Sequence, residues 1–176
     1  MSVWVTLRCS LFLPSKIHNS FSLDKNFLYG SDCPWFYRET DVFGGTNNKN
    51  GFYSFCYYNM KKPDHPAYYD HIEPIWKHMN LGDNFNIGVT QVRANLVFRD
   101  INTNESGFHI DKDKGTSSIL ILTSCNAKTL FKKNGEEVVV NSVDNRFVTF
   151  DSNIKHKVVY QTDTWRRIVI NMNYFC

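Results

Sequence analysis

The sequence lacks long apolar runs and paired cysteines. No segment approaches the uninterrupted apolar stretch of about 18 residues that a membrane span needs. Arg8 breaks the apolar start of the chain and no small-residue cleavage site follows, so we expect no signal peptide. The five cysteines are dispersed without a C-x-x-C pair, which is typical of reduced thiols rather than of a disulfide framework or a zinc knuckle. We therefore expect a soluble protein of the cytoplasm, or of the host cytoplasm if a virus encodes it, with no membrane association.

A concentrated basic surface is also missing. The net charge is only +3, and neighbouring cations occur only as the doublets Lys61-Lys62, Lys132-Lys133 and Arg166-Arg167. Binding to nucleic acid normally needs a longer stripe of lysines and arginines, so this pattern argues against a nucleic-acid partner. With 176 residues, of which 42% are apolar and 21% charged, the chain has room for one packed domain.

β-branched residues are scarce in the first half of the chain and abundant in the second. Only 9 of the 36 Val, Ile and Thr residues precede residue 87. Because β-branched side chains favour pleated strands, the second half is predicted to be sheet. Turn residues divide it into the runs Ile87–Phe98, Gly107–Ile110, Ser117–Ser124, Lys128–Lys132, Glu136–Val140, Arg146–Phe150, Lys155–Gln161 and Arg166–Phe175. Short strands at intervals of about ten residues are typical of a sandwich or a jelly roll.

The first half is predicted to support this sheet with helix and loop. Apolar residues recur at helical spacing over residues 64–80, and Pro74 within them predicts a kink or a split into two short helices. An aromatic cluster, Phe52–Tyr58, is expected to pack in the core or in a hairpin. We interpret residues 1–176 as a single domain, mainly β with flanking helices (α+β). Residues 1–86 would form the N-terminal support and residues 87–176 the β core.

Two histidines and a carboxylate fall at the edges of predicted strands. His109 and Asp111 are two residues apart, so they face the same side of a strand and can reach one metal ion together. His156 opens a later strand, and the four strands between them return the chain to the same end of a jelly roll. Two imidazoles and one carboxylate on one face leave coordination positions open, as non-haem Fe(II) oxygenases require. The H-x-D tripeptide alone is a weak signal, and its position at strand edges carries the prediction.

The second half of the chain resembles the 2-oxoglutarate- and Fe(II)-dependent dioxygenases, particularly small prolyl-hydroxylase-like members encoded by phages and marine bacteria. The resembling stretches are Arg93–Leu96, Phe108–Asp111, Asn145–Asp151 leading to His156, and Arg167–Asn171. The family's fold is a double-stranded β-helix, a cupin-like jelly roll, which agrees with the predicted strands. The resemblance implies that His109, Asp111 and His156 bind Fe(II).

The resemblance also implies that a basic residue on the last strand binds the distal carboxylate of 2-oxoglutarate. Arginine suits this role because its planar guanidinium donates two parallel hydrogen bonds. Arg167 shares its face with Asn171 and is expected to line the barrel interior, whereas Arg166 lies on the apolar face, so we favour Arg167. Asn95 stands where related enzymes hydrogen-bond the cosubstrate, although a structural role fits it equally well. A tyrosine that the family often has on the third strand is absent here.

We therefore predict an Fe(II)- and 2-oxoglutarate-dependent oxygenase that uses O2 to hydroxylate a substrate and releases succinate and CO2. A prolyl (peptidyl) substrate is slightly favoured over a small metabolite. The alternative is a non-catalytic, cupin-like barrel that binds a metal or another ligand. Because related enzymes place a substrate lid in this region, residues 44–58 are predicted to form a mobile loop near the iron. The oligomeric state stays open.

Overall fold

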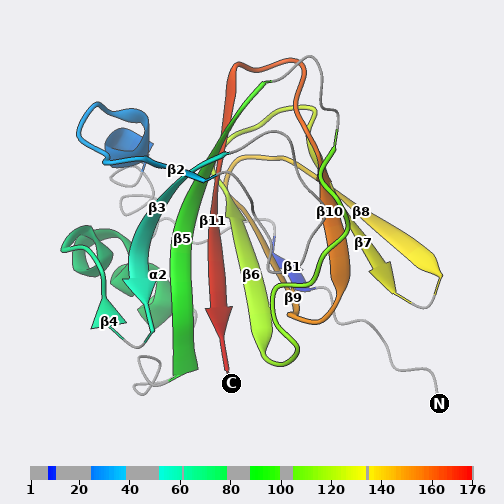
Figure 1. The fold of residues 1–176 in the computed structure, drawn as a ribbon, viewed down its shortest axis with the longest axis horizontal. Helices are drawn as coiled ribbons and strands as arrows, with labels where there is room; N and C mark the ends of the chain where they lie inside the picture. Colours follow the sequence, from blue (N-terminus) through cyan, green and yellow to red (C-terminus); the bar gives the residue numbers. More distant parts are fainter. Residues whose placement is uncertain are drawn as a thin grey trace.

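Two antiparallel sheets form the body of the protein. The computed structural model describes residues 8–10, 25–38, 52–60, 62–78, 88–99, 105–133 and 135–175. The strands are β1 (Arg8–Ser10), β2 (Phe36–Arg38), β3 (Phe52–Asn59), β4 (Lys62–Pro63), β5 (Val89–Phe98), β6 (Thr116–Ile121), β7 (Lys128–Lys133), β8 (Glu136–Asn141), β9 (Arg146–Asp151), β10 (Lys155–Val159) and β11 (Arg166–Tyr174). The main sheet has the order β1-β9-β6-β11-β5-β3-β2, with β4 paired to β3 (Figure 1). The smaller sheet has the order β10-β7-β8.

Strand β11, at the centre of the main sheet, presents alternate residues to two apolar clusters. Ile168 and Ile170 belong to the cluster that also contains Ile75 and Trp76 from the helical layer. Val169 belongs to the second cluster, which includes Phe131 of the smaller sheet. Burying a large apolar side chain contributes about 1.5–3 kcal/mol relative to leaving it exposed. A shift of the β11 register by one residue would move each of its side chains to the opposite face of the sheet, so this shift is strongly disfavoured. The apolar face of β11 packs against the helical layer, as the sequence predicts.

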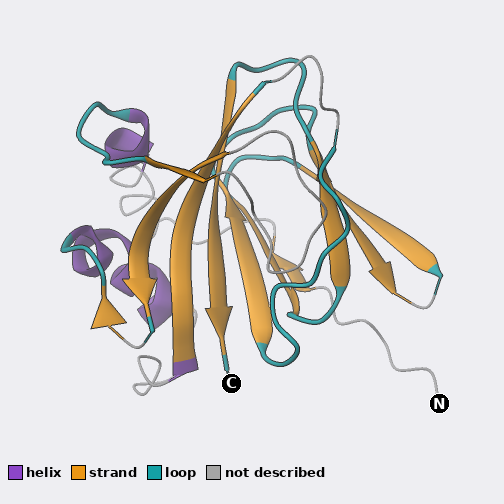
Figure 2. Ribbon diagram, in the orientation of Figure 1, coloured by secondary structure: helices purple, strands orange, loops and turns teal. Residues whose placement is uncertain are grey.

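The helical layer consists of two short helices, as predicted from the proline. A π-helix, η1 (Tyr68–Ile72), is followed directly by the α-helix α2 (Glu73–His78). Pro74 is the second residue of α2 and directly follows Glu73, whose N–H donates to the carbonyl of Tyr68, so the missing N–H of proline falls at the junction of the two helices. Figure 2 shows these helices on the outer side of the main sheet, and a further short helix at residues 25–29 precedes β2. The protein is thus mainly β with flanking helices, as expected.

The first half also contributes strands that the sequence did not indicate. β3 pairs with β5, β2 pairs with β3, and β1 pairs with β9, so residues before 87 widen the main sheet at both edges. The aromatic cluster forms most of β3, and Phe55, Tyr57 and Tyr58 are buried, which confirms its core packing. Counting β-branched residues missed this strand because aromatic side chains fit pleated surfaces equally well.

One predicted strand in the second half is wrong. Residues 107–110 form no strand but run along β10, with isolated bridges from Glu105 to Val159 and from His109 to His156. Gly107 lies between these bridges, and glycine weakens a strand because it has no side chain to pack. The other seven predicted runs correspond to β5 through β11. Residues 44–50, the turn-rich part of the predicted lid, lie outside the described residues.

Two further expectations concern membranes and thiols. Within the described ranges, no helix combines the length and the hydropathy that crossing a membrane requires. Cys33, Cys56 and Cys125 are free thiols, as the dispersed pattern predicts. Cys9 lies in β1, where only the backbone is described, and Cys176 lies outside the described residues.

Candidate metal centre

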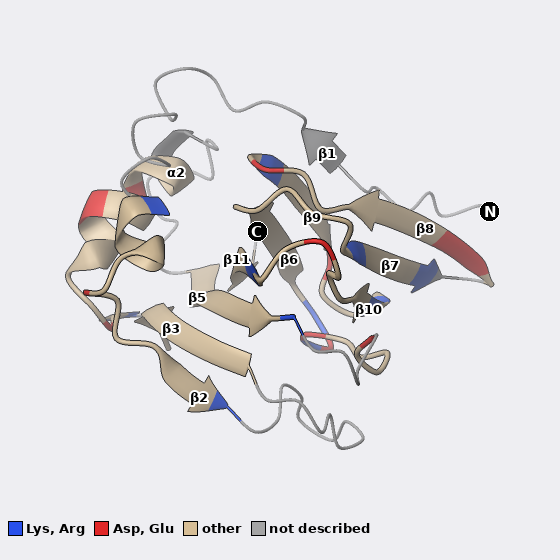
Figure 3. Ribbon diagram, turned by 90° about the horizontal axis from the view of Figure 1, so that it is seen from above, with Lys and Arg blue, Asp and Glu red and all other residues tan. Residues whose placement is uncertain are grey.

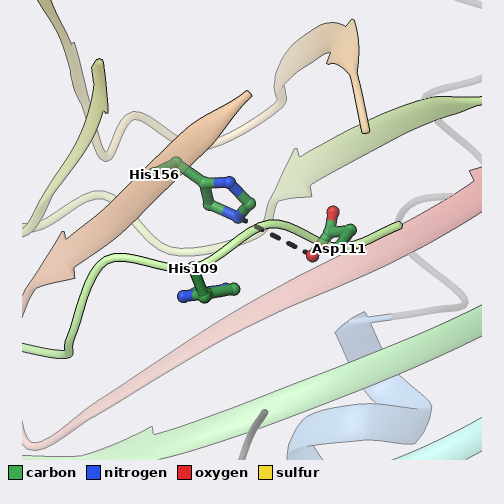
Figure 4. A group of neighbouring side chains, drawn as sticks. All are labelled: His109, Asp111 and His156. Carbon is green, nitrogen blue, oxygen red and sulfur yellow. Dashed lines mark ion pairs between the residues drawn. The ribbon is translucent and has the colours of Figure 1, made fainter. Parts of the chain in front are cut away.

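His109, Asp111 and His156 meet where residues 105–111 run beside β10. His109 and His156 form an antiparallel bridge, in which each backbone N–H donates to the other's carbonyl at 3.0 and 2.9 Å. Their ring centroids are 4.4 Å apart. Oδ1 of Asp111 lies 3.7 Å from Nε2 of His156 (Figure 4). One potential ligand atom from each residue lies within 4.8 Å of the other two, so the structure brings all three predicted ligands together.

Both imidazoles are oriented by backbone carbonyls. Nδ1 of His109 lies 3.2 Å from the carbonyl oxygen of Gly107, and Nδ1 of His156 lies 3.0 Å from that of Ile154. A carbonyl oxygen can only accept, so each neutral ring carries its proton on Nδ1 and its lone pair on Nε2. This is the usual arrangement of metal-binding histidines, whose second nitrogen donates to a carbonyl or a carboxylate. The rings are therefore prepared to bind a cation through Nε2.

The backbone of Asp111 is anchored to the main sheet by a buried hydrogen-bond network. The N–H groups of Asp111 and Lys112 donate to the carbonyl of Ser152 at 3.0 and 3.3 Å. Oγ of Ser152 lies 2.9 Å from Oγ of Ser117, which donates to Oδ1 of Asn173 at 2.8 Å. The three polar residues that support Asp111 are buried, and a satisfied buried network holds its members in one arrangement. Strands β6 and β11 thus set the position of the carboxylate.

The centre is apolar on one side and open on the other. His156 is only 3% exposed. Its ring stacks on Phe131, with centroids 5.7 Å apart, and meets the edge of Phe150 at 5.0 Å. His109 and Asp111 are half-buried. A metal ion held here would be shielded from water by the smaller sheet and accessible from the opposite side.

A pocket leads from the two histidines to Arg167. Its lining comes from both sheets and consists of Phe52, Asn95, Val97, Ser106, His109, Ile119, Thr129, His156, Val158, Tyr160, Arg167, Val169 and Asn171. Arg167 is 3% exposed, and its Nε donates to Oγ of Ser142 at 3.0 Å. No described carboxylate lies within ion-pair distance of this guanidinium. Burial lowers the pKa of Arg167, and a buried cation is costly unless an anion pairs with it. The pocket therefore favours an anionic ligand.

The other two predicted site residues occupy different surroundings. Arg166 is exposed and lies on the opposite face of β11, with its guanidinium carbon 4.4 Å from the ring centroid of Tyr29. Asn95 is 6% exposed and lines the pocket, where its Oδ1 accepts no hydrogen bond from any described residue. The structure thus places Asn95 and Arg167 in the pocket and keeps Arg166 outside it.

Four further polar residues line the pocket that the sequence analysis did not single out as pocket residues, namely Ser106, Thr129, Tyr160 and Asn171. Asn171 shares a strand face with Arg167, and Tyr160 lies four residues after His156, so strand alternation could have found both. Thr129 is buried on β7 and reaches the pocket only because the smaller sheet packs against the main one. No local sequence signal indicates that approach.

Comparison with known proteins reveals likeness in structure rather than in sequence. No protein-family model matches the sequence, and no curated protein is significantly similar to it. A 2OG-Fe(II) oxygenase family oxidoreductase from Burkholderia pseudomallei aligns with TM-score 0.65 and 12% identity over 96% of this chain and 85% of its own. A prolyl-4-hydroxylase from Pseudomonas putida aligns with TM-score 0.61 and 14% identity over 97% and 92% of the two chains.

A third similar structure contains a peptide. It is a prolyl hydroxylase from Trichoplax adhaerens in complex with a hypoxia inducible factor oxygen degradation domain fragment. The alignment has TM-score 0.68 and 14% identity, over 96% of this chain and 83% of the other. The protein therefore has the double-stranded β-helix fold, the cupin-like jelly roll of 2-oxoglutarate oxygenases, which confirms the fold predicted from the sequence.

Proposed function

We propose that the protein is an Fe(II)- and 2-oxoglutarate-dependent oxygenase that hydroxylates its substrate with O2 and releases succinate and CO2. The observation that carries the proposal is the pocket itself. A buried arginine without a described ion-pair partner lines the same pocket as two histidines, and a carboxylate lies beside one of them. A dicarboxylate that reaches from a metal ion to a guanidinium matches this distribution of charge.

The donor set fits Fe(II). His109 and His156 offer neutral nitrogens and Asp111 an anionic oxygen, a combination that suits non-haem iron and leaves further positions for ligands. Neighbouring octahedral ligands about 2.1 Å from a metal are about 3 Å apart. The observed 3.7 Å between Asp111 and His156 is close enough for side-chain rotation to close the gap. When bound, the iron would supply the oxidising chemistry together with 2-oxoglutarate and O2.

The protein's own residues would bind and orient the cosubstrate. Arg167 would pair with its distal carboxylate through two parallel hydrogen bonds. Asn95 offers an amide oxygen in the pocket that accepts no hydrogen bond within the described part of the chain. Phe131 and Phe150 close the side of His156 and keep water from that part of the centre. Within this proposal Arg166 has no contact with the cosubstrate.

A prolyl residue in a peptide is the substrate that we favour. Two of the similar structures are prolyl hydroxylases, and one of them holds a peptide. The open side of the centre, where two ligands are half-buried, offers access to a chain longer than a metabolite. A cytoplasmic location is consistent with the three free thiols of the described residues.

Replacement of the metal ligands tests the proposal. His109→Ala and Asp111→Ala should each lower Fe(II)-dependent release of succinate from 2-oxoglutarate by more than about 100-fold, in line with the loss of a metal ligand. Circular dichroism should show an intact fold. Asp113→Ala is the matched control because Asp113 is an exposed carboxylate in the same loop, and it should leave turnover unchanged. Metal binding without succinate release by the parent protein would favour the alternative, a non-catalytic barrel.

A further inference from the structure

Strand β8 forms an edge of the smaller sheet, and no described strand pairs with its outer side. The opposite edge of this sheet is covered, because residues 105–109 run along β10 and bridge to Val159 and His156. Figure 1 shows β7 and β8 extending away from the main sheet, with β8 on the outside. An uncovered edge strand carries a row of backbone N–H and C=O groups without partners in the sheet. β8 is therefore open to pairing with a further strand.

Alternate residues of β8 direct their backbone groups away from β7. The N–H of Ser142, directly after β8, donates to the carbonyl of Ala127 at 2.9 Å, on the side of β7. Backbone hydrogen-bonding groups point alternately to the two sides of an antiparallel strand. The residues that present these groups at the free edge are therefore Glu137, Val139 and Asn141.

β8 lacks the features that usually keep an edge strand from pairing. Natural sheets protect their edges with lysine, proline, bulges or very short strands. The edge strands β1 and β2 of the main sheet have three residues each, whereas β8 has six, without lysine or proline and with an unbroken register to β7. Figure 3 shows acidic residues only in the first part of β8. Val138 and Val139 are 43% and 51% exposed, so this edge favours an apolar, extended partner.

We propose that β8 pairs antiparallel with β8 of a second copy of the chain, so that the two smaller sheets join into one. A two-fold axis through Val139 gives a self-complementary register. Val139 then faces its own counterpart, Val138 faces Val140, and Glu137 faces Asn141. Parallel pairing in register would instead place like charges of the two copies side by side, which is destabilising. An axis through Val138 would place Glu137 opposite a valine, so the register centred on Val139 is favoured.

The charges around the edge complement each other in this register. Oε1 of Glu137 lies 4.0 Å from Nζ of Lys132 in the same chain. Lys128 lies opposite Asn141 in the pairing of β7 with β8. The proposed register therefore brings Lys128 of the second copy to the other side of Glu137, one strand beyond Asn141. Each glutamate is then flanked by two lysines, and the two-fold symmetry repeats this arrangement at both ends of the strand pair.

The proposed interface is small. On the outer face of the smaller sheet, Val139 lies opposite Leu130, so the two copies join their apolar surfaces there. The two Val139 residues exchange two backbone hydrogen bonds, and the N–H of each Asn141 donates to the carbonyl of Glu137. The carbonyl of Asn141 keeps its hydrogen bond from Nη1 of Arg146 at 2.8 Å. A single pair of such strands falls below the roughly 1,200 Å² that stable interfaces bury, so we expect a dissociation constant of roughly 10–100 µM.

Sedimentation velocity of the full-length protein between about 2 and 300 µM tests the association. The parent protein should change from monomer to dimer over this range. Val139→Lys should weaken dimerisation at least tenfold, because two like charges then meet at the axis, and Val139→Glu should do the same if the lysine variant folds poorly. Met60→Lys is the matched control, since Met60 is 80% exposed directly after β3, and it should dimerise like the parent. A parent protein that stays monomeric, or a Val139→Lys variant that dimerises equally tightly, would overturn the proposal.

Cysteine cross-linking tests the register. In Val139→Cys the two introduced thiols face each other with Cα atoms about 5.5 Å apart, within the range of about 4.4–6.8 Å that a disulfide spans. Oxidation with diamide should therefore give a covalent dimer on a non-reducing gel, compared with the parent protein to account for its own thiols. In Glu137→Cys the two thiols lie about four residues apart along the strands, roughly 13 Å, so no covalent dimer should form. Cross-linking of Glu137→Cys but not of Val139→Cys would show that the proposed register is wrong.

Discussion

Replacing Arg167 should weaken the binding of 2-oxoglutarate without lowering the stability of the fold. Arg167 is buried in the pocket, its Nε donates to Oγ of Ser142, and it forms no ion pair with any described carboxylate. In Arg167→Met the apolar side chain has a similar length, so the pocket loses the charge with little loss of volume. Replacing a buried charged group by a packed apolar one is often neutral or stabilising. Ser142 keeps a partner because its Oγ also donates to the carbonyl of Thr123 at 3.1 Å. The melting temperature of the ligand-free variant should therefore stay the same or rise.

In contrast to the melting temperature, the affinity for 2-oxoglutarate should fall sharply in Arg167→Met. Without Arg167, the distal carboxylate of the cosubstrate would be buried unpaired, which typically costs about 3–5 kcal/mol. This corresponds to a loss of affinity by a factor of roughly several hundred to several thousand. Arg167→Lys keeps the positive charge but loses the planar guanidinium that donates two parallel hydrogen bonds, so its loss of affinity for 2-oxoglutarate should be intermediate. Calorimetric titration with 2-oxoglutarate in the presence of Mn(II), without oxygen, measures each affinity.

Arg166 provides the matched control on the same strand. Its guanidinium lies over Tyr29 on the other face of β11, so Arg166→Ala should change the affinity for 2-oxoglutarate by less than about tenfold, or 1.4 kcal/mol. Loss of 2-oxoglutarate binding in Arg166→Ala together with normal binding in Arg167→Met would contradict the assignment of Arg167. A large drop in the melting temperature of Arg167→Met without ligand would show that Arg167 has a structural role instead.

Two further predictions concern the support of the metal centre and the thiols. Ser117→Ala removes the hydroxyl that holds Ser152, so the affinity for Mn(II) should fall by about tenfold. Ser118 is equally buried but lies on the other face of β6, so Ser118→Ala is the control and should leave the affinity for Mn(II) unchanged. Equal effects of the two variants on Mn(II) binding would contradict the positioning role of this network. Burial raises the pKa of Cys33 to about 12 and, together with a neighbouring carboxylate, that of Cys56 to about 11. Because the thiolate is the reactive form, alkylation by iodoacetamide at pH 8 should be at least about 100-fold slower for both thiols than in urea, as followed by mass spectrometry. Alkylation of the native protein at the unfolded rate would show that the thiols are exposed.

Local regularities of the sequence were sufficient for much of the fold and the site. Clustering of β-branched residues predicted the strands of the second half because these side chains favour pleated backbone wherever they occur. The two-residue spacing of His109 and Asp111 was enough to place them on one side of an extended segment. The same alternation distinguished Arg167 from Arg166, since a strand with one apolar face must turn its polar row the other way. Each of these properties depends on neighbours within a few residues.

Contacts between distant segments were decided only by the tertiary structure. The aromatic strand β3 and the short strands β1 and β2 join the main sheet through pairings with residues far along the chain, and no local pattern specifies such partners. Thr129 enters the pocket because one sheet packs on another. Arg38 shares a face with Asn95 because two successive strand registers align them. Register across strands is set by packing of the whole core, which a sequence pattern taken one segment at a time does not contain.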